Sequence, residues 1–407
     1  MFKCRFCQNT LEVCFADLNT APIVNNYIAQ EDLYKEDIYY PLKVFVCSKC
    51  HLVQTIDFNP ASQIFHENYA YFSSYSNSWL KHCQEYVDMI IAKLSLNQNS
   101  FITEIASNDG YLLQYFKEKN IQYLGIEPCK SVAESAKAKG INTLIEFFNL
   151  KTAKNLQKAD LICMSNVLAH IPDINDFTAA ITETLKPKGT LTIEFPHLLN
   201  IIKFNQFDTI YLEHYSYLSL LFLQKLFDAH NLRIYDIEEL NTHGGSLRIY
   251  GAHRGNQSIA VNKENIDRVL KQETDLGLDK IEVYKSFNEK MKKTKRDILS
   301  LLNEIKNSGK SIAAFGASAK GNTLFNYCGI STDYIDYSVD DIPYKQNKFL
   351  PGSRIPVKPR SELIKTKPDY IFITPWNFKD EIIGKLEYAK KDWGAKFIIP
   401  IPKPEII

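Results

Sequence analysis

The sequence predicts an α/β protein in which a small cysteine-bearing module precedes two α/β domains. Two regions, 101–250 and 311–401, alternate short buried strands with amphipathic helices, which is typical of parallel βαβ units in doubly wound sheets. The residues before them carry two Cys-x-x-Cys pairs and little helical periodicity. A chain of 407 residues has room for two or three domains. We place the module bounds at 1–68, 69–255 and 256–407.

The expected strands are short apolar runs, each of which ends at turn residues. In the middle domain they are FITEIA (101–106), YLGIE (123–127), DLICMSN (160–166) and TLTIEF (190–195), with a helix over 111–120. In the C-terminal domain they are SIAAFGA (311–317), YIDYSVD (334–340), YIFITP (370–375) and KFIIPI (396–401). Helical spacing of Trp79, Tyr86, Ile90 and Leu94 predicts a helix before the first strand. The charged stretch 280–310 indicates a helix that is solvated or that connects two domains.

The composition is ordinary for a globular protein and argues against two classes of partner. The net charge is +1, so bulk attraction to nucleic acid or to an anionic membrane is not expected. No apolar run approaches the roughly 18 residues that a membrane-spanning helix needs, and the first residues show no signal-peptide core. Nine scattered cysteines favour reduced thiols over a secreted disulfide framework. We therefore expect a cytoplasmic protein that is a monomer or a weak homo-oligomer.

Four cysteines, in the pairs Cys4-x-x-Cys7 and Cys47-x-x-Cys50, predict one structural zinc site. Zinc prefers four thiolates in a tetrahedron, and each pair brings two of them into range of one ion. A single pair could be a redox pair or chance, but two that bracket a short polar region are more specific. Their separation exceeds the commonest spacing of roughly 15 to 20 residues, which leaves room for an inserted strand or loop. The other cysteines are assigned to packing: Cys14, Cys83, Cys129, Cys163 and Cys328.

The loop EIASNDG, residues 104–110, indicates a nucleotide site after the first strand. Glu127 ends the next strand, where an acid can accept hydrogen bonds from the ribose of NAD or of S-adenosylmethionine (SAM). NAD requires G-x-G-x-x-G, whereas this loop has one glycine and two acids, which suit the sulfonium and ammonium of SAM. The alternative is a turn that only reverses the chain. The residues assigned to SAM are Glu104, Ala106, Asn108, Asp109, Gly110, Glu127 and Asn166.

Polar residues also follow two later strands of this domain. Asn166 and His170 come after DLICMSN, and Glu194 and His197 lie in and after TLTIEF. Ligands of open α/β sheets bind outside the carboxyl ends of the strands, so all four are candidates for the pocket. A lone histidine is more often a packing or capping residue, and His170 is favoured over His197 by its position.

The stretch IYLEHYSYLSL, residues 210–220, places an acid and a base among tyrosines. Methyl transfer to carbon requires a carbanion, which an adjacent carbonyl can stabilise as an enolate. Such chemistry needs a base near neutral pH and donors for the oxyanion. His214 fits the base, Tyr211 and His170 fit the donors, and Glu213 could bind a substrate hydroxyl or tune a pKa. Taken alone, the stretch also fits an aromatic-rich helix start with a surface Glu-His pair.

The chain resembles the SAM-dependent sugar C-methyltransferases that make branched deoxysugars from nucleotide-linked 4-keto sugars. The matching stretches run nearly from end to end. They are the two cysteine pairs, YFSSYSNSW, EIASNDGYLL, GIEP, NVLAHIPDINDF, EFPHLL, YLEHYSYLS, THGGSLRIY, GASAKGNTLFNYCGI and PYKQNKFLPGSRIPV.

This resemblance implies a zinc module, a class I methyltransferase domain and a C-terminal Rossmann-like domain that helps to hold the nucleotide sugar. The Tyr-x-Glu-His motif falls on Tyr211, Glu213 and His214. His214 would remove the proton alpha to the ketone, and His170 and Tyr211 would stabilise the enediolate. The methyl group would go to carbon three of the sugar.

Two features of the resemblance involve single positions. A further tyrosine near the end of the first module belongs to the family's site, and we choose Tyr71, with Tyr69 and Tyr75 as rivals. The SAM loop has Ala106 where relatives more usually have glycine. We expect its methyl group to narrow the loop slightly without preventing binding.

The C-terminal loop GASAKGN, residues 316–322, could receive a diphosphate at the start of a helix. From the residues alone, a loop used only for packing is equally plausible, and the resemblance favours contact with the nucleotide sugar. The residues assigned to the substrate are Gly316, Ser318, Lys320 and Asn322. The loop is neither a Walker loop nor an NAD fingerprint. Lys345 and Arg354 are interpreted as surface charges.

Two other functions fit parts of the sequence. A SAM-dependent O-methyltransferase acting on a sugar or small molecule would need the same cofactor site but would give no reason for the tyrosine, glutamate and histidine cluster. A zinc-knuckle binding protein with a non-catalytic methyltransferase fold would not need the SAM loop, Glu127 or the Tyr-x-Glu-His motif.

Overall fold

The computed structural model describes residues 2–56 and 72–407. The chain divides into two compact units, each assembled from separate stretches. Unit 1 contains Met1–Glu12, Val46–Leu199 and Tyr215–Lys280, and unit 2 contains Val13–Phe45, Asn200–His214 and Ile281–Ile407. The module bounds at residues 68 and 255 stay a prediction. Each unit is described by itself.

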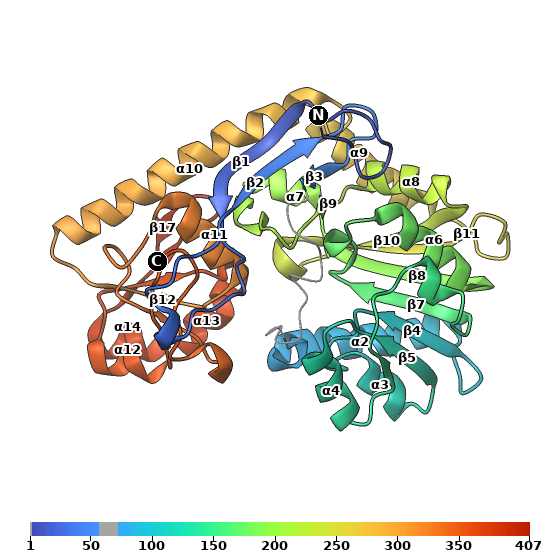
Figure 1. The fold of residues 1–407 in the computed structure, drawn as a ribbon, viewed down its shortest axis with the longest axis horizontal. Helices are drawn as coiled ribbons and strands as arrows, with labels where there is room; N and C mark the ends of the chain where they lie inside the picture. The colour runs from blue at the N-terminus through green and yellow to red at the C-terminus, as the bar shows by residue number, and fades with distance from the viewer. Residues whose placement is uncertain (1, 57–71) are drawn as a thin grey trace. The chain divides into compact units, whose positions relative to one another are not determined.

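Unit 1 is built on a seven-stranded sheet (Figure 1). Its strands, in spatial order, are β10 (Leu232–Leu240), β11 (Ser246–His253), β8 (Leu185–Pro196), β7 (Ala159–Ser165), β4 (Phe101–Ile105), β5 (Gln122–Ile126) and β6 (Thr143–Leu144). Strands β4 to β8 are parallel, and β11 runs antiparallel to both of its neighbours. The four expected strands form, and the α/β fold class is confirmed. The carboxyl ends of β4, β5, β7 and β8 therefore share one edge, where a ligand site is expected.

The helices of unit 1 pack against this sheet. They are α2 (Asn77–Leu94), α3 (Leu113–Glu118), α4 (Lys130–Ala138), α5 (Leu150–Ala153), α6 (Ile174–Thr184), α8 (Leu220–Ala229) and α9 (Lys263–Leu276). Tyr86 and Ile90 of α2 are buried with β4 in one core cluster, as the helical spacing predicts. Helix α3 is shorter than the expected 111–120, because Asn120 takes a left-handed φ of 56° that a helix cannot continue.

Unit 2 contains a six-stranded sheet. Its strands, in spatial order, are β14 (Val357–Lys358), β13 (Ser338–Val339), β12 (Ile312–Phe315), β15 (Tyr370–Ile373), β16 (Lys396–Ile399) and β17 (Glu405–Ile406). All neighbouring strands are parallel except β17, which is antiparallel to β16. The expected strand 334–340 is reduced to β13, because Tyr334 closes a turn with its amide on the Ser331 carbonyl. The helices around this sheet are α11 (Ala319–Cys328), α12 (Ser361–Thr366), α13 (Lys379–Lys385) and α14 (Glu387–Trp393).

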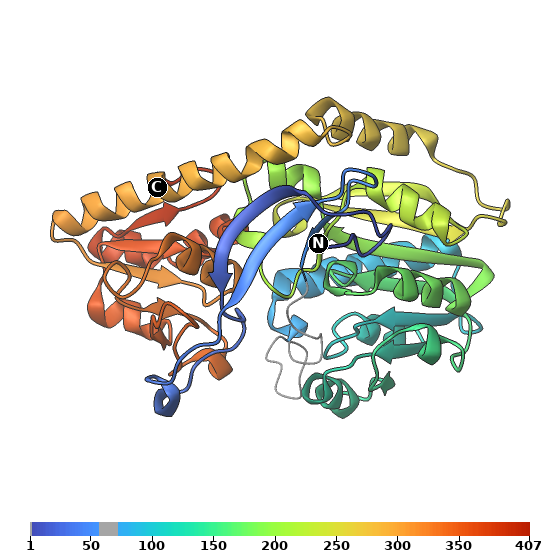
Figure 2. The same ribbon diagram turned by 45° about the horizontal axis from the view of Figure 1, so that its top comes forward.

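The long helix α10 (Ile281–Asn307) runs beside strand β1 (Val13–Ala21) in unit 2 (Figures 1 and 2). Its buried residues recur at spacings of three and four, so one face is apolar although the helix is rich in charge. Phe287 stacks on Phe15 of β1 with ring centroids 4.4 Å apart. Strand β2 (Tyr40–Val46) is the neighbour of β1. The helix predicted from the charged stretch is confirmed, and the structure adds the strand that covers its apolar face.

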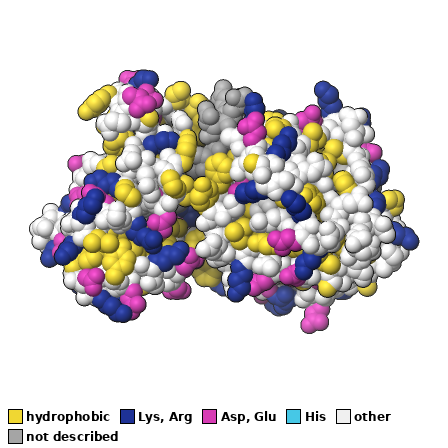
Figure 3. All heavy atoms as spheres, turned by 90° about the horizontal axis from the view of Figure 1, so that it is seen from below, with side chains coloured by type: hydrophobic (Ala, Val, Ile, Leu, Met, Phe, Trp, Pro, Cys, Tyr) yellow, Lys and Arg dark blue, Asp and Glu magenta, His cyan; other side chains and the backbone are white. Residues whose placement is uncertain are grey.

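The surface and the helices agree with the charge analysis. Positive and negative side chains are interspersed on the face drawn in Figure 3, without a continuous basic stripe there. Among the described helices, none combines the length and the apolar character that crossing a bilayer requires.

Candidate functional site

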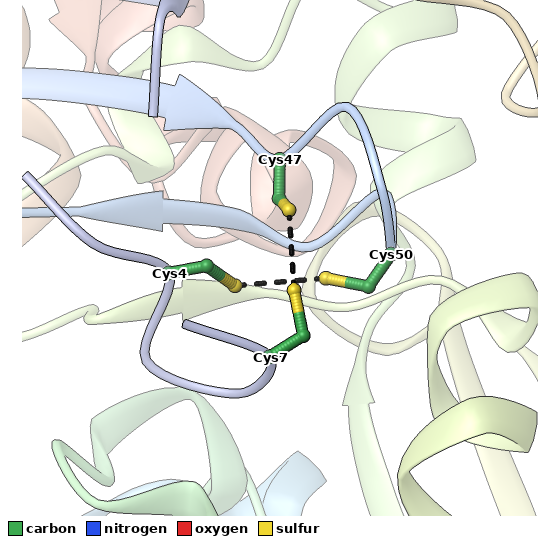
Figure 4. Close-up of side chains that lie close together, drawn as sticks. All are labelled: Cys4, Cys7, Cys47 and Cys50. Atoms are coloured by element: carbon green, nitrogen blue, oxygen red, sulfur yellow. Dashed lines mark hydrogen bonds between the residues drawn. The ribbon is translucent and has the colours of Figure 1, made fainter. Parts of the chain in front are cut away.

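The four cysteines of the two Cys-x-x-Cys pairs converge in unit 1, as Figure 4 shows. Their sulfur atoms all lie within 4.8 Å of one another. Cys4 and Cys50 have Sγ atoms 3.6 Å apart, and those of Cys7 and Cys47 are 3.5 Å apart. Four sulfurs bound to zinc at about 2.3 Å would be separated by about 3.8 Å. The donor set and its spacing therefore fit a tetrahedral zinc ion.

The two pairs sit in matching turns. The amide after each second cysteine donates to the carbonyl of the first: Gln8 to Cys4 at 3.0 Å and His51 to Cys47 at 2.9 Å. Gln8 and His51 both adopt a left-handed φ, which lets each turn fold its two sulfurs to one side. Gln54 Nε2 also donates to Cys4 Sγ at 3.2 Å, the kind of support that ligand sulfurs receive. With four protein ligands, such a zinc is structural.

The predicted SAM loop follows β4 as a tight, left-handed turn. Ala106, Asn108 and Gly110 have φ angles of 56°, 49° and 80°. A Cβ on Gly110 would lie 2.7 Å from Ile141 Cγ1, so glycine is needed for both its φ and its size. Ala106 carries strain at this φ that glycine would not.

Glu127, at the end of β5, supports the loop from beside it. Its Oε2 accepts the Asn108 amide at 3.0 Å, and its Oε1 accepts the Cys129 amide at 2.8 Å. Burial raises the pKa of Glu127, and the two amides act against that rise. The predicted acid is therefore next to the loop in space, as its position after the second strand indicates.

Five buried oxygen atoms at this edge have no hydrogen-bond partner among the residues that the structure describes. They are both carboxylate oxygens of Glu104, Oγ of Ser107, Oδ1 of Asp109 and Oδ1 of Asn166. Unsatisfied buried polar atoms are costly, and such a group of acceptors suits a ligand with an ammonium and hydroxyls. Burial raises the pKa of Glu104 well above its usual range; Tyr111 acts against that rise, and the nearby Glu127 and Asp109 add to it. A bound cation would oppose that shift, so the residues present fit SAM.

Asp109 has a cation beside it already. Its Oδ2 accepts from Lys139 Nζ at 2.9 Å and is also bonded to the Ser74 hydroxyl. Of the two acids that the sequence assigns to the SAM sulfonium and ammonium, Glu104 is thus the less compensated. Asn108 Oδ1 accepts the Ser73 amide at 2.8 Å, which ties the loop to the segment before α2.

Sequence reasoning missed an aromatic and histidine cluster at the same edge. His243, in the 3₁₀ turn η5 (Thr242–Gly244), has a left-handed φ of 53° and lies 3.1 Å from Asn166 through Nε2 and Nδ2. The Trp79 ring lies 5.3 Å from that of His243 and 5.0 Å from that of His82, measured between centroids. The histidine and glycines of THGG were a visible signal, since non-glycine residues with positive φ concentrate at functional turns.

Glu194 is the buried anchor of this cluster. It accepts from Arg248 NH2 at 2.7 Å and Thr242 Oγ1 at 2.9 Å, and His82 Nε2 lies 2.9 Å from it. Burial raises the pKa of Glu194, but the hydrogen bond with His82 and the charge of Arg248 outweigh burial and lower it to about 2. Glu194 therefore holds the edge of the sheet together as a carboxylate.

His197 is a packing residue in this structure. Its side chain is 1% exposed, and its Nε2 lies 2.7 Å from Glu273 of α9. Glu273 also accepts the amides of Leu220 and Leu221, at 2.6 and 2.8 Å, at the start of α8. The position of His170 is different: it ends the 3₁₀ turn η3 (Leu168–His170) beyond β7.

The Tyr-x-Glu-His segment has a defined geometry within unit 2. His214 Nδ1 lies 2.9 Å from the carbonyl oxygen of Thr209. A carbonyl only accepts, so Nδ1 carries the proton and Nε2 of the neutral ring keeps its lone pair. The rings of Tyr211 and His214 lie 3.9 Å apart between centroids. Glu213 Oε1 accepts from Asn25 Nδ2 at 2.8 Å.

The tyrosines and His170 are only partly placed. Tyr71 and Tyr69 lie outside the described residues, and Tyr75 is 62% exposed in the turn η2 (Ser73–Tyr75). In unit 1, Tyr215 donates its amide to the Ala169 carbonyl at 2.7 Å. The residue after His214 is therefore bonded to the residue before His170.

The C-terminal loop makes contacts within unit 2. Ser318 caps α11 by accepting the Gly321 amide, and Asn322 Nδ2 donates to the Val24 carbonyl at 2.6 Å. Lys320 Nζ donates to Thr209 Oγ1 at 2.7 Å. Gly316 has a φ of 97°, and a Cβ there would lie 2.6 Å from Pro375 Cδ. The assignment of this loop to the substrate stays a prediction.

Lys345 is not the surface charge that the sequence suggested. Its side chain is 13% exposed, and Nζ donates to the Ala317 carbonyl at 2.8 Å and to Asp340 at 3.2 Å. Arg354 is also engaged, with Asp37 at 3.2 Å. Lys345 was misread because the Ala317 carbonyl that it bonds lies 28 residues away in the chain.

Three family models match successive parts of the chain. They are described as "Putative zinc binding domain" over residues 4–65, "Methyltransferase domain" over 79–237 and "C-methyltransferase C-terminal domain" over 241–402. The chain is 30% identical to C-methyltransferase NovU of Streptomyces niveus over 415 residues, which covers 100% of this chain and 96% of that one.

Solved structures include partial likenesses to this chain. Magnesium protoporphyrin IX methyltransferase of Synechocystis PCC 6803 with bound SAM has a TM-score of 0.34 and 13% identity, covering 47% of this chain and 88% of that one. The PH0226 protein of Pyrococcus horikoshii OT3 has a TM-score of 0.38 and 10% identity, covering 48% and 99%.

The end-to-end relative and the three family models agree with the zinc-binding cysteines and with the SAM edge of unit 1. The chain belongs to the family of SAM-dependent C-methyltransferases.

Proposed function

We propose that this enzyme transfers a methyl group from SAM to carbon three of a nucleotide-linked 4-keto-deoxysugar, through an enolate, in branched-sugar biosynthesis. The observation that carries the proposal is the tautomer of His214. Its Nδ1 proton is engaged by the Thr209 carbonyl, which puts the lone pair of the neutral ring on Nε2, the atom that we assign to take the substrate proton. A ketone lowers the pKa of the neighbouring C–H group, because the carbanion is stabilised as an enolate. A histidine can therefore serve as the base.

The steps follow from the residues of the chain. His214 Nε2 takes the proton from the carbon beside the ketone, and the electron pair moves to the carbonyl oxygen. His170 and Tyr211 donate hydrogen bonds to that oxygen, while Glu213, itself bonded to Asn25, accepts from a substrate hydroxyl. SAM supplies an electrophilic methyl group on a sulfonium. The enolate carbon would form the new C–C bond as the S–CH3 bond of SAM breaks, which leaves S-adenosylhomocysteine and restores the ketone. His214 would then release its proton to solvent.

The residues around the SAM edge support this division of work. The acids of the loop attract the cationic cofactor, and Glu104 is the acid with two unsatisfied oxygens. An O-methyl transfer would need the same cofactor site and could also use a histidine base. Transfer to carbon is favoured by the full-length similarity to C-methyltransferase NovU.

The test is hydrogen exchange in deuterated buffer on a panel of 4-keto-6-deoxy nucleotide sugars, followed by mass spectrometry. The wild-type enzyme without SAM should exchange one proton alpha to the ketone, and with SAM it should add one methyl mass. His214→Asn should bind SAM normally and lose exchange and transfer together by about a hundredfold or more. His253→Asn is the matched control, because His253 is bonded to the Leu185 carbonyl in unit 1.

Methyl gain without exchange at any carbon would point to O-transfer. A His214→Asn enzyme that exchanges at the wild-type rate would exclude His214 as the base. Failure of the whole panel in both assays, with SAM bound, would reject nucleotide-linked 4-keto sugars as the substrate class.

A further inference from the structure

We propose that Lys320 is a positioning residue for His214 that acts through Thr209, and this inference rests on the proposed function of His214 as the base. Two contacts within unit 2 link the three residues in a relay. Lys320 Nζ donates to the Thr209 hydroxyl at 2.7 Å, and the Thr209 carbonyl faces His214 Nδ1 at 2.9 Å. Lys320, in the first turn of α11, thus holds Thr209 in place, and the Thr209 carbonyl selects the tautomer of His214.

The segment that carries the acceptor is short and needs support. Thr209 ends the three-residue 3₁₀ turn η4 (Phe207–Thr209), which is too short to hold its own geometry. Asp208 of this turn accepts from Trp376 Nε1 at 2.6 Å. The Lys320 ammonium lies 5.3 Å from the centroid of the same indole ring, within cation–π range. Trp376 and Lys320 therefore bond two adjacent residues of η4, Asp208 and Thr209.

The surroundings of Lys320 favour this role over contact with a diphosphate. Thr209 and Asp208 are 3% and 1% exposed, so the ammonium is directed toward buried groups of its own unit. Burial lowers the pKa of Lys320, and the charge of Asp208 acts against that shift. A carboxyl group in the same cluster would also repel a diphosphate.

Loss of the ammonium should loosen η4 without removing either catalytic atom. The Thr209 carbonyl would no longer be held opposite Nδ1, and the ring would begin to populate the form protonated on Nε2. That form cannot accept a proton from the substrate at Nε2. Because general-base catalysis contributes about a hundredfold or more, a partial loss of the correct tautomer should reduce proton exchange by about tenfold.

The test compares Lys320→Met, Thr209→Val and the double variant in the full-length enzyme. Nitrogen-15 NMR of labelled histidine reads the His214 tautomer directly and requires no substrate. Each single variant should raise the fraction protonated on Nε2 and lower kcat about tenfold, with KM nearly unchanged. The double variant should lose no more than the worse single one, since both changes break one relay. The affinities for uridine diphosphate and thymidine diphosphate should stay at wild-type values.

Lys345→Met is the matched control. It removes another ammonium that is bonded within the same unit, to Ala317 and Asp340, and should lower Tm while leaving the His214 tautomer unchanged. Variants with the wild-type tautomer would overturn the relay, as would additive losses in the double variant. Weaker diphosphate binding with unchanged kcat would assign Lys320 to the substrate instead. If the tautomer shifts as expected but His214→Asn keeps full exchange, the relay stands and the proposed base fails.

Discussion

Each unit has a strand, a loop and a helix at the carboxyl edge of its parallel strands, but the two loops differ in the hydrogen bonds that their polar atoms make. The loop after β4 leaves Glu104, Ser107 and Asp109 with buried oxygens that lack partners in the described chain. The loop after β12 uses Ser318 and Lys320 to bond other parts of unit 2. The same local architecture therefore leaves several buried acceptors without partners in one unit and makes internal contacts in the other. The two loops differ in how many buried oxygens lack a partner among the described residues: four in residues 104–110 and one, Oδ1 of Asn322, in residues 316–322.

Removal of zinc should have the largest effect, because the knuckles belong to unit 1 alone. Structural zinc contributes about 10 kcal/mol or more in small zinc-dependent folds. Cys47→Ser with Cys50→Ser should abolish zinc by elemental analysis and lower the Tm of unit 1 more than that of unit 2. Cys14→Ser in β1 is the control. Full zinc content in the double variant would contradict the four-cysteine site.

The next largest effect should come from Glu104→Gln. It keeps the shape of the side chain but removes the charge that compensates the cation of SAM. We expect SAM affinity to fall about a hundredfold, close to 2.7 kcal/mol, by calorimetry, while the affinity for nucleoside diphosphates is unchanged. Glu183→Gln, which removes a carboxylate paired with Lys158 at the surface, is the control. If Glu104→Gln and Glu183→Gln bound SAM with equal affinity, the loop after β4 would not be the loop that binds the cofactor through Glu104.

The same residue predicts a pH dependence. The raised pKa of Glu104 keeps it protonated in the ligand-free enzyme to higher pH than in the unfolded chain. SAM affinity should therefore rise with pH through this pKa, and the dependence should vanish in Glu104→Gln. The stability of the ligand-free enzyme should fall as pH rises above the unfolded value, because the folded state holds the extra proton. Opposite slopes for binding and stability would support Glu104 as the group responsible.

Substitution of one glycine in each loop should have a smaller effect and should further distinguish the loop after β4 from the loop after β12. Gly110→Ala and Gly316→Ala both force a methyl group into a left-handed, crowded position, which should cost about 1 to 3 kcal/mol each in denaturant unfolding. Gly110→Ala should also weaken SAM binding. Gly316→Ala should leave SAM affinity alone, so a loss there would mean that the β12 loop contributes to the cofactor site.

The smallest expected effect is a gain. Ala106 has a φ of 56°, and glycine would relieve about 1 kcal/mol of strain, partly offset by its greater freedom in the unfolded chain. Ala106→Gly should therefore raise Tm by a few degrees or leave it unchanged, with SAM affinity near the wild-type value. A clear loss of stability would show that the methyl group makes packing contacts worth more than the strain.

Local patterns located the strands and loops that carry the site. FITEIA and DLICMSN form β4 and β7, because apolar runs of that length are buried wherever they pair. The two Cys-x-x-Cys turns predicted the four converging sulfurs, since the spacing within each turn fixes its geometry. The assignments of Asn166 and Glu127 to one edge followed from parallel strands ending together.

Distant contacts were beyond the reach of such patterns. Lys345 read as a surface charge, yet it donates to the Ala317 carbonyl, 28 residues away in the chain. The insertion between the cysteine pairs was expected, but its membership of unit 2 was not. His243 gave no periodic signal, and only the folded edge brings it to Trp79, whereas His82 lies on α2 three residues after Trp79.

The sequence by itself determined the fold class, the zinc ligands and the family, and it predicted the cofactor loop, because each depends on residue types at fixed local spacing. The tertiary structure alone decided which polar groups are satisfied. Lys320 and Thr209 are 111 residues apart, and His82 and Glu194 are 112 apart. Pairings over such separations form through the packing of whole elements, and no local periodicity encodes them. They decide how many polar atoms of each of the two similar loops are left without a partner in the described chain.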